Sequence, residues 1–404
     1  MTDESPRESA AARGPLHGVR VVEIGQSIAA PFAAALLADL GADVVKVEIP
    51  SGDLLRGAGP RQDDVPLWWK ATNRNKSLVS LDLRSKPGRA ALNELLDPAD
   101  VLIENLLPGS LKRLGLAVDD LLERHERLVV VSVTGFGQSG PASSRKAFAR
   151  AVEAFAGLTY STGSPDGPPI HTGVPLADYV AGLFAALGAV AGMRARDELG
   201  ATEQHVDVAM FESIVRILEH QVVDYAQLGR VTERVGNRMP TQAGVGVFRA
   251  GDGSWISMTG GPHDVMAARM LAMAGVARTE DDLGSAAGRL RQREFIERGL
   301  AAWASGSTRA ELVEAGIKND VPVAPVNSMA DLAGDEHVLA RGSIVRVDDR
   351  DLGTVGMPAT VPRFSHQQTG VRHAAPLEPE DVRAVTNRWR QGQMPDDKEQ
   401  DDDA

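Results

Sequence analysis

The chain of 404 residues contains no cysteine. This absence excludes disulfide bonds, thiol nucleophiles and thiolate metal sites, and it suits a protein of the reducing cytoplasm, which is the location we expect. Aromatic residues are also scarce, at 4% of the sequence. The hydrophobic share of 43% and the charged share of 24% are nevertheless ordinary for a soluble globular protein long enough to hold two domains.

Positive charge is in short supply, since the formal net charge is −12. A general binder of nucleic acids or anionic membranes is therefore excluded, and an anionic ligand would have to meet a local basic patch. The nine histidines show no pair spaced four residues apart with a carboxylate, so the sequence predicts no metal site.

A secretory apolar segment is missing from the start of the chain, where residues 1–15 form a polar tail that we expect to be disordered. Residues 391–404 form an acidic tail of the same kind. The apolar stretch 172–193 approaches the length that spans a membrane, but Pro175, Asp178 and four glycines favour a buried soluble element instead.

The folded part alternates short valine-rich runs with runs rich in alanine and leucine. This alternation predicts an α/β fold, a Rossmann-like open parallel sheet with helices on both faces. The predicted strands lie within 16–25, 43–50, 77–83, 100–106 and 128–137.

Composition shifts near residue 228, where glycines become dense. The segment 247–258 contains an Asp-Gly turn between two strand-like arms, which predicts a β-hairpin in a second, smaller α+β domain. The predicted organisation is a tail at 1–15, a large domain at 16–200, a linker helix at 201–227, a small domain at 228–318, a return segment to the large domain at 319–390 and a tail at 391–404.

Open parallel sheets bind ligands at the carboxyl ends of their strands. The first such end, Gly25 to Ala29, lacks the G-x-G-x-x-G fingerprint, which disfavours a nicotinamide or flavin dinucleotide. It nearly matches G-x-S-x-G, the nucleophile elbow of a serine hydrolase centred on Ser27. Ala29 replaces the last glycine, and no obvious acid and histidine follow, so the hydrolase is the most remote alternative.

Asp178 is the only formally charged residue between Thr172 and Met193. A carboxylate among small apolar residues must be hydrogen-bonded, cap a helix or react, because leaving it unpaired is costly. One reading makes Asp178 the N-cap of a helix that begins at Tyr179. A second makes it a nucleophile, and the two readings are compatible.

Several basic residues lie near predicted strand ends or in the loops beside them. Their convergence on one edge of the sheet in an acidic protein indicates a partner that carries phosphate groups. These residues are Lys46, Arg56, Arg74, Lys76 and Arg113.

A set of ordered motifs resembles the class III CoA-transferases, the CaiB/BaiF group that includes formyl-CoA transferase and the α-methylacyl-CoA racemases. The resemblance covers about residues 16–366. Its motifs are VRVVEIGQSIAAPFAAALLADLGADVVKVEIPSGD, NRNKSLVSLDL, DVLIENLLPGSLKRLGL, VTGFGQSGP, GVPLADYVAG, GATEQHVDVAMFES and VPVAPVNSMADL.

The resemblance implies that Asp178 attacks an acyl-CoA thioester, forms a mixed anhydride and then an aspartyl-CoA thioester, and passes CoA to a carboxylic acid acceptor. It implies no tightly bound cofactor, an interlocked homodimer, no nucleic-acid or membrane partner, and oxyanion donors among the glycines of 244–261. It also implies that coenzyme A contacts Ile28, Ala29, Lys46, Arg74, Asn75, Lys76, Arg113 and Lys146.

One departure bears on the chemistry. The racemase branch carries a His-Asp pair where this chain has Phe148 and Ala149, and these two side chains cannot move an α-proton. Many transferases keep an acidic residue where Ala149 stands. The departure disfavours a racemase, the first alternative, and keeps open a second, a CoA-binding subunit with little activity of its own.

Overall fold

The computed structural model describes residues 13–202, 204–260, 263–276 and 283–393, which divide into two compact units. The first unit comprises the residues up to Leu158, the segment His171–Gly229 and the residues from Ala340 onward. The second comprises Thr159–Ile170 and Arg230–Leu339.

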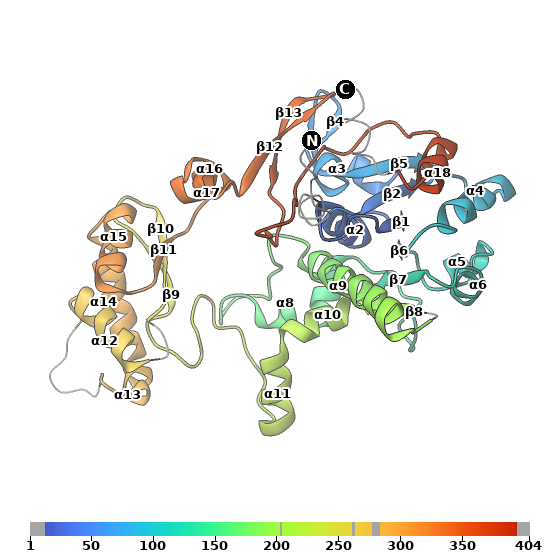
Figure 1. Cartoon of the computed structure of the whole chain (residues 1–404). Helices are drawn as coiled ribbons and strands as arrows, with labels where there is room; N and C mark the ends of the chain where they lie inside the picture. Colours follow the sequence, from blue (N-terminus) through green and yellow to red (C-terminus); the bar gives the residue numbers. More distant parts are fainter. Residues whose placement is uncertain (1–12, 203, 261–262, 277–282, 394–404) are drawn as a thin grey trace. The chain divides into compact units, whose positions relative to one another are not determined.

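The first unit is built on a six-stranded sheet in the order β5-β2-β1-β6-β7-β8, in which every neighbouring pair is parallel (Figure 1). Numbered along the chain, this order is 3-2-1-4-5-6, the order of a doubly wound α/β fold. The α/β fold with an open parallel sheet is therefore confirmed. The strands are β1 (Arg20–Ile24), β2 (Asp43–Glu48), β5 (Lys76–Ser80), β6 (Val101–Glu104), β7 (Val129–Thr134) and β8 (Gln204–Ala209).

Neighbouring residues of the central strands enter two separate apolar cores, because successive side chains of a strand point to opposite faces. Val21 packs in one core with α2 (Ala29–Asp39), α7 (Ala149–Phe155), α9 (Leu176–Leu199) and α10 (Met210–Ile217). Val22 packs in the other with α4 (Lys86–Leu96), α5 (Ser110–Arg113), α6 (Val118–Arg124) and α18 (Val382–Arg390). Helices therefore cover both faces of the sheet.

Shorter elements complete the first unit. They include the helix α11, which ends at a left-handed Gly229, and the antiparallel pair of β12 and β13. Their bounds are η1 (Leu54–Gly57), β3 (Arg61–Gln62), β4 (Val65–Pro66), α3 (Leu67–Thr72), α11 (Glu219–Leu228), β12 (Ile344–Asp349) and β13 (Gly353–Pro358).

The second unit has its own apolar core and a three-stranded antiparallel sheet in the order β11-β10-β9. The predicted hairpin is present as β9 (Gly246–Arg249) and β10 (Trp255–Met258). The other elements are β11 (Val323–Pro325), α12 (Asp264–Met273), α13 (Ala286–Arg291), α14 (Arg293–Ser305), α15 (Arg309–Asn319) and α16 (Met329–Gly334). Two of the four boundaries between the units fall in α8 (Leu158–Ser161) and α17 (Glu336–Ala340).

The chain is divided differently from the expected organisation in two places. The segment 201–227, expected as a linker helix, supplies the edge strand β8 and then α10 and most of α11, all in the first unit. The expected boundary at 318 lies inside the second unit, because β11 pairs with β10 rather than with the large sheet. Pairing between strands that are distant in the sequence decides to which unit β8 and β11 belong. The local sequence pattern does not predict such pairing.

Helix α9 runs unbroken for 24 residues, from Leu176 to Leu199, and so begins three residues before Tyr179, the start that one reading of the sequence gave it. Pro175 lies just outside the first turn, where proline costs a helix nothing. By length and composition alone α9 could cross a membrane, with a mean hydropathy of 1.6 over its most apolar window. In the structure it packs against α2 and the sheet through small residues, namely Ala177, Ala181, Gly182, Ala185, Ala189 and Gly192.

We expect Gly182→Ala to destabilise the protein, because a Cβ there would lie 2.8 Å from Cδ1 of Phe32 and 2.9 Å from the carbonyl oxygen of Ala29. Such overpacking costs about 1–3 kcal/mol, more than the roughly 1 kcal/mol that alanine gains over glycine in a helix. Thermal unfolding measures the loss as a lower Tm. Gly334→Ala in α16 is the matched control, since nothing lies within 4 Å of its Cβ position; equal effects of the two changes would contradict the close approach of α2 and α9.

Candidate active site

Two adjoining cavities lie at the carboxyl edge of the large sheet. The chain leaves neighbouring strands β1 and β6 there, and this is the point where the strand order reverses, the usual binding position in such sheets. The cavities measure about 550 and 380 Å³. Gln26 and Leu106, which follow β1 and β6, line both of them.

The loop after β1 is held in one conformation by side chains from other strand ends. Asn105, which follows β6, accepts the backbone N–H of Gln26 at 2.8 Å and donates to the carbonyl of the same residue at 2.8 Å. Asp53 accepts the N–H of Ser27 at 3.0 Å. Ser27 needs this support, because its φ of 64° is left-handed, a conformation that residues other than glycine rarely adopt.

Under this loop lies a cluster of buried charges. The carboxylate of Glu23 lies 2.8 Å from Nζ of both Lys46 and Lys76, and Lys46 also pairs with Asp53 at 3.0 Å. Lys46 donates to the carbonyl of Gly25 at 2.8 Å, which ties the cluster to the loop. Burial alone would raise the pKa of Glu23, but the two ammonium groups hold it below its ordinary value.

Asp178 lies in the first turn of α9 and lines the smaller cavity. It is not the N-cap that the sequence suggested, because the helix begins at Leu176 and Pro175 occupies the cap position. Burial raises the pKa of Asp178 to about 6, a hydrogen bond from the backbone N–H of Ala29 opposes the shift, and the charge of Glu153 adds to it. The cavity thus presents a carboxylate that binds no cation among the described residues.

The rest of the smaller cavity contains positive charge and an aromatic ring. Lys146 and Arg145 line it from the loop before α7, and both side chains are exposed. Phe148 lines it too and is 69% exposed. No histidine hydrogen-bonds Ser27 among the described residues, so the geometry offers nothing for the hydrolase alternative.

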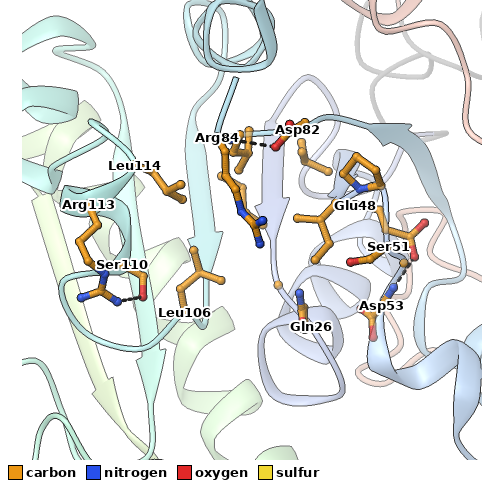
Figure 2. Close-up of a pocket in the computed structure, with 17 residues that line it drawn as sticks. Gln26, Glu48, Ser51, Asp53, Asp82, Arg84, Leu106, Ser110, Arg113 and Leu114 are labelled. Carbon is orange, nitrogen blue, oxygen red and sulfur yellow. Dashed lines mark hydrogen bonds between the residues drawn. The ribbon is translucent and has the colours of Figure 1, made fainter. Parts of the chain in front are cut away.

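The larger cavity has two arginines at its rim (Figure 2). Arg84 extends its guanidinium into the space between Leu106 and Glu48, and no hydrogen bond or ion pair holds that guanidinium within the described part of the chain. Arg113 bonds Oγ of Ser110 at 2.7 Å. Arg84 was missed in the sequence, although it directly follows the predicted strand at 77–83 and a cation after a parallel strand lies at the ligand edge.

The structure brings only some of the predicted coenzyme A contacts to these cavities. Ala29, Arg113 and Lys146 line them, as does Asp178. Ile28 instead packs against a small apolar cluster around Leu55.

Four other predicted contacts are buried and bonded to acidic residues, so they do not form the open basic cluster that we expected. Lys46 and Lys76 are each only 1% exposed and are neutralised by the carboxylates of Glu23 and Asp53. Arg74 and Asn75 are also buried and bond Asp39 at the end of α2, at 2.6 and 2.8 Å. A sequence shows that a residue is basic, but its pairing with a distant carboxylate depends on the fold.

A second carboxyl group with a shifted pKa, Glu104, ends β6 next to Asn105. Burial raises the pKa of Glu104 to about 7, against hydrogen bonds from Ser132 and from the N–H of Leu106. The nearby charge of Asp207 raises it further. As for metals, the described residues contain no group of three histidine, aspartate or glutamate side chains that could hold an ion.

The whole chain was compared with known proteins. Residues 16–381 match the model of CoA-transferase family III. The beta subunit of succinyl-CoA–L-malate CoA-transferase from Chloroflexus aurantiacus is 37% identical over 90% of this chain and 91% of its own length. Acetyl-CoA:oxalate CoA-transferase from Acetobacter aceti is 31% identical over 90% of this chain and 92% of its own length.

Among solved structures, a CAIB/BAIF family protein from Brucella suis superimposes with a TM-score of 0.82, at 29% identity, over 93% of this chain and all of the other. This chain has a doubly wound α/β fold with a carboxylate at the switch-point cavities, and the relatives named above are enzymes that transfer CoA. The chain belongs to CoA-transferase family III and is an enzyme whose substrates are CoA thioesters.

The raised pKa of Glu104 implies that the stability of the protein depends on pH. Its folded pKa lies above its unfolded value, so its contribution to stability is complete below about pH 4.5 and is lost as the pH rises through 7. We expect Glu104→Gln to reduce the fall in the free energy of unfolding between pH 5 and 8, by at most about 3 kcal/mol. Denaturation at both pH values measures the change. The exposed Glu94→Gln is the control, and an equal change there would contradict the assignment.

Proposed function

We propose that this enzyme is an acyl-CoA:carboxylate CoA-transferase that works through covalent intermediates on Asp178. The observation that carries the proposal is the carboxylate of Asp178, which has no cationic partner in the described part of the chain and lies in a switch-point cavity beside the cavity that Arg84 and Arg113 border. Membership of CoA-transferase family III supports it, since such enzymes move CoA between acids.

The proposed reaction balances without a redox partner or a net proton. An oxygen of Asp178 attacks the thioester carbonyl carbon, the C–S bond breaks, and CoA leaves as a thiolate from a mixed anhydride. The thiolate attacks the aspartyl carbonyl, which releases the donor acid and leaves an aspartyl-CoA thioester. The acceptor carboxylate attacks the carbonyl carbon of the aspartyl-CoA thioester and expels the CoA thiolate, which leaves a second mixed anhydride. The thiolate then attacks the acceptor's carbonyl carbon in this anhydride, forms the CoA thioester of the acceptor and releases the carboxylate of Asp178.

The environment of Asp178 suits this role. With a pKa of about 6 the group is ionised at neutral pH, yet it is more basic than an ordinary aspartate and so a better nucleophile. The N–H of Ala29 holds one face of the carboxylate in place. The glycines of 244–261, from which the sequence analysis expected oxyanion donors, belong to the second unit, and Gly261 lies outside the described residues.

Coenzyme A is proposed to lie along the carboxyl edge of the sheet, with its phosphate-bearing end in the larger cavity and its thioester in the smaller one. Arg84 and Arg113 supply charge for the phosphate groups, and Lys146 supplies it near the reacting carboxylate. No tightly bound cofactor is needed for this chemistry.

Two alternative functions are a racemase and a CoA-binding subunit. Phe148 lines the cavity with a ring that cannot accept a proton, which disfavours a racemase. A CoA-binding subunit would bind CoA without transferring it.

We also propose that the enzyme is a cytoplasmic homodimer. Exposed apolar residues on α9 and α11 support the assembly, since large apolar patches mark interaction surfaces. They are Leu183, Leu187, Val222, Val223 and Leu228.

Asp178→Asn is expected to reduce kcat at least about 1,000-fold, because the amide is not a nucleophile, while the Kd for CoA stays unchanged. Succinyl-CoA with L-malate and acetyl-CoA with oxalate are the assay pairs, chosen from the relatives. In the wild type, kcat/KM should fall as the pH drops below about 6, because the protonated carboxyl cannot attack. Hydroxylamine added with the donor should leave a hydroxamate on Asp178, detected by mass spectrometry.

Other variants and readouts separate the alternatives. Ser27→Ala would abolish a hydrolase and is expected to leave CoA transfer in place. Full transfer by Asp178→Asn contradicts the proposal. CoA binding without an adduct from either donor favours the binding subunit, and α-proton exchange in deuterated water favours the racemase.

Arg84→Ala and Arg113→Ala are each expected to raise KM for succinyl-CoA about tenfold with little change in kcat, because a charge-assisted bond to phosphate is worth about 1.5–3 kcal/mol. The effect should shrink at high salt, since both side chains are exposed. Steady-state kinetics at two ionic strengths measure it. Arg194→Ala, an exposed cation at the far end of α9, is the control, and an unchanged KM in both cavity variants would refute this placement of CoA.

A further inference from the structure

Glu153 is a fully buried carboxylate to which neither the sequence nor the proposed reaction gives a role. It lies on α7 with 0% exposure, and no ion pair reaches it within the described ranges. A buried carboxylate without a cation is costly unless hydrogen bonds compensate it. It is also the only acidic residue of α7. Position 149, one turn earlier in the same helix, is alanine.

The hydrogen bonds of Glu153 go to the segment that carries Asp178. One oxygen accepts the backbone N–H of Ala177 at 3.2 Å. The other lies 3.1 Å from the hydroxyl oxygen of Thr172, whose single proton it shares with the carbonyl oxygen of Val174 at 2.8 Å. Ala177 is the second residue of α9, so its N–H is one of the donors that a helix start leaves unsatisfied. Pro175, at the cap position, has no side-chain oxygen to accept them.

Glu153, which lies on α7, therefore caps the start of α9. The sequence had suggested that Asp178 would cap this helix. The first turn of α9 is capped through Ala177, which leaves the carboxylate of the next residue free to face the cavity. The same arrangement sets a negative charge close to Asp178, and this charge contributes to its raised pKa.

Few other charges face Asp178. Arg145 and Lys146 line the same cavity from the loop before α7. The loop after β1, which supplies the N–H of Ala29, has no charged side chain between Gly25 and Ala29. On α9 itself the next charged residue is Arg194. Glu153 is thus the acidic group placed to act on the proposed nucleophile.

We propose that Glu153 is a positioning residue for Asp178, capping the first turn of α9 from α7 and setting the electrostatic environment of the adjacent carboxylate. The proposal rests on the proposed function only for its effect on catalysis. Its geometric part concerns the fold and can be tested without any activity.

Glu153→Gln separates the charge from the cap. The amide oxygen can still accept the N–H of Ala177, and the NH₂ group can donate to the hydroxyl oxygen of Thr172, so the structure should persist. We expect the ionisation of Asp178, and with it the acid limb of kcat/KM, to move to lower pH by a few tenths of a unit or more. At pH 8 the activity should stay within about threefold of the wild type, because both hydrogen bonds remain.

Glu153→Ala removes the cap as well. We expect kcat/KM at pH 8 to fall about 10- to 100-fold, because a nucleophile displaced by a fraction of an ångström loses that much rate. Thr172→Val removes one hydrogen bond and keeps the charge, so the acid limb should stay in place. Glu94→Gln, an exposed charge change on α4, should move neither quantity.

The ionisation of Asp178 is read directly by ¹³C titration of aspartate-labelled protein, with the signal assigned by its loss in Asp178→Asn. An unmoved titration in Glu153→Gln would overturn the proposal, and so would an equal shift in Glu94→Gln. If Asp178→Asn retained full transfer, the proposed function would fail, yet the titration would still test Glu153. If Glu153→Ala does not fold, Glu153→Gln alone decides.

Discussion

The buried carboxylate of Glu23, set between the ammonium groups of Lys46 and Lys76, is the interaction on which the site depends. Three strands contribute to it, since these residues lie on β1, β2 and β5. Removing one partner of such a cluster leaves a buried charge uncompensated, which typically costs about 3–5 kcal/mol. The cluster reaches the loop after β1 through the bond from Lys46 to Gly25, so the sheet and the loop are fixed together.

The same loop also holds Asp178, the proposed nucleophile. Ala29, where α2 begins, gives its N–H to Asp178, and its carbonyl lies against Gly182 one turn further along α9. The small residues on the inner face of α9 permit this approach, and larger ones would push the helix away. The close packing of α2 against α9 therefore also places the carboxylate of Asp178.

The electrostatics of the site divide between two kinds of group. The carboxylates of Glu23 and Asp53 neutralise the ammonium groups of Lys46 and Lys76 inside the protein. Arg84 and Lys146 reach the cavities with no protein partner among the described residues, which suits them to an anionic substrate. An enzyme with a net charge of −12 thus still offers positive side chains at these two cavities.

The sequence alone was enough to determine the parallel α/β fold and the hairpin of the second unit, and it singled out Asp178 as a candidate, because hydrophobic periodicity, an Asp-Gly turn and a lone charge in an apolar stretch are local signals. Only the tertiary structure decided which basic residues are buried, that β8 joins the sheet, and that α9 begins at Leu176 with its cap supplied by Glu153. Lys46 and Glu23 stand 23 positions apart, and Glu153 and Ala177 stand 24 apart. Pairings over such separations depend on how helices and strands pack, and the pattern of neighbouring residues does not encode them.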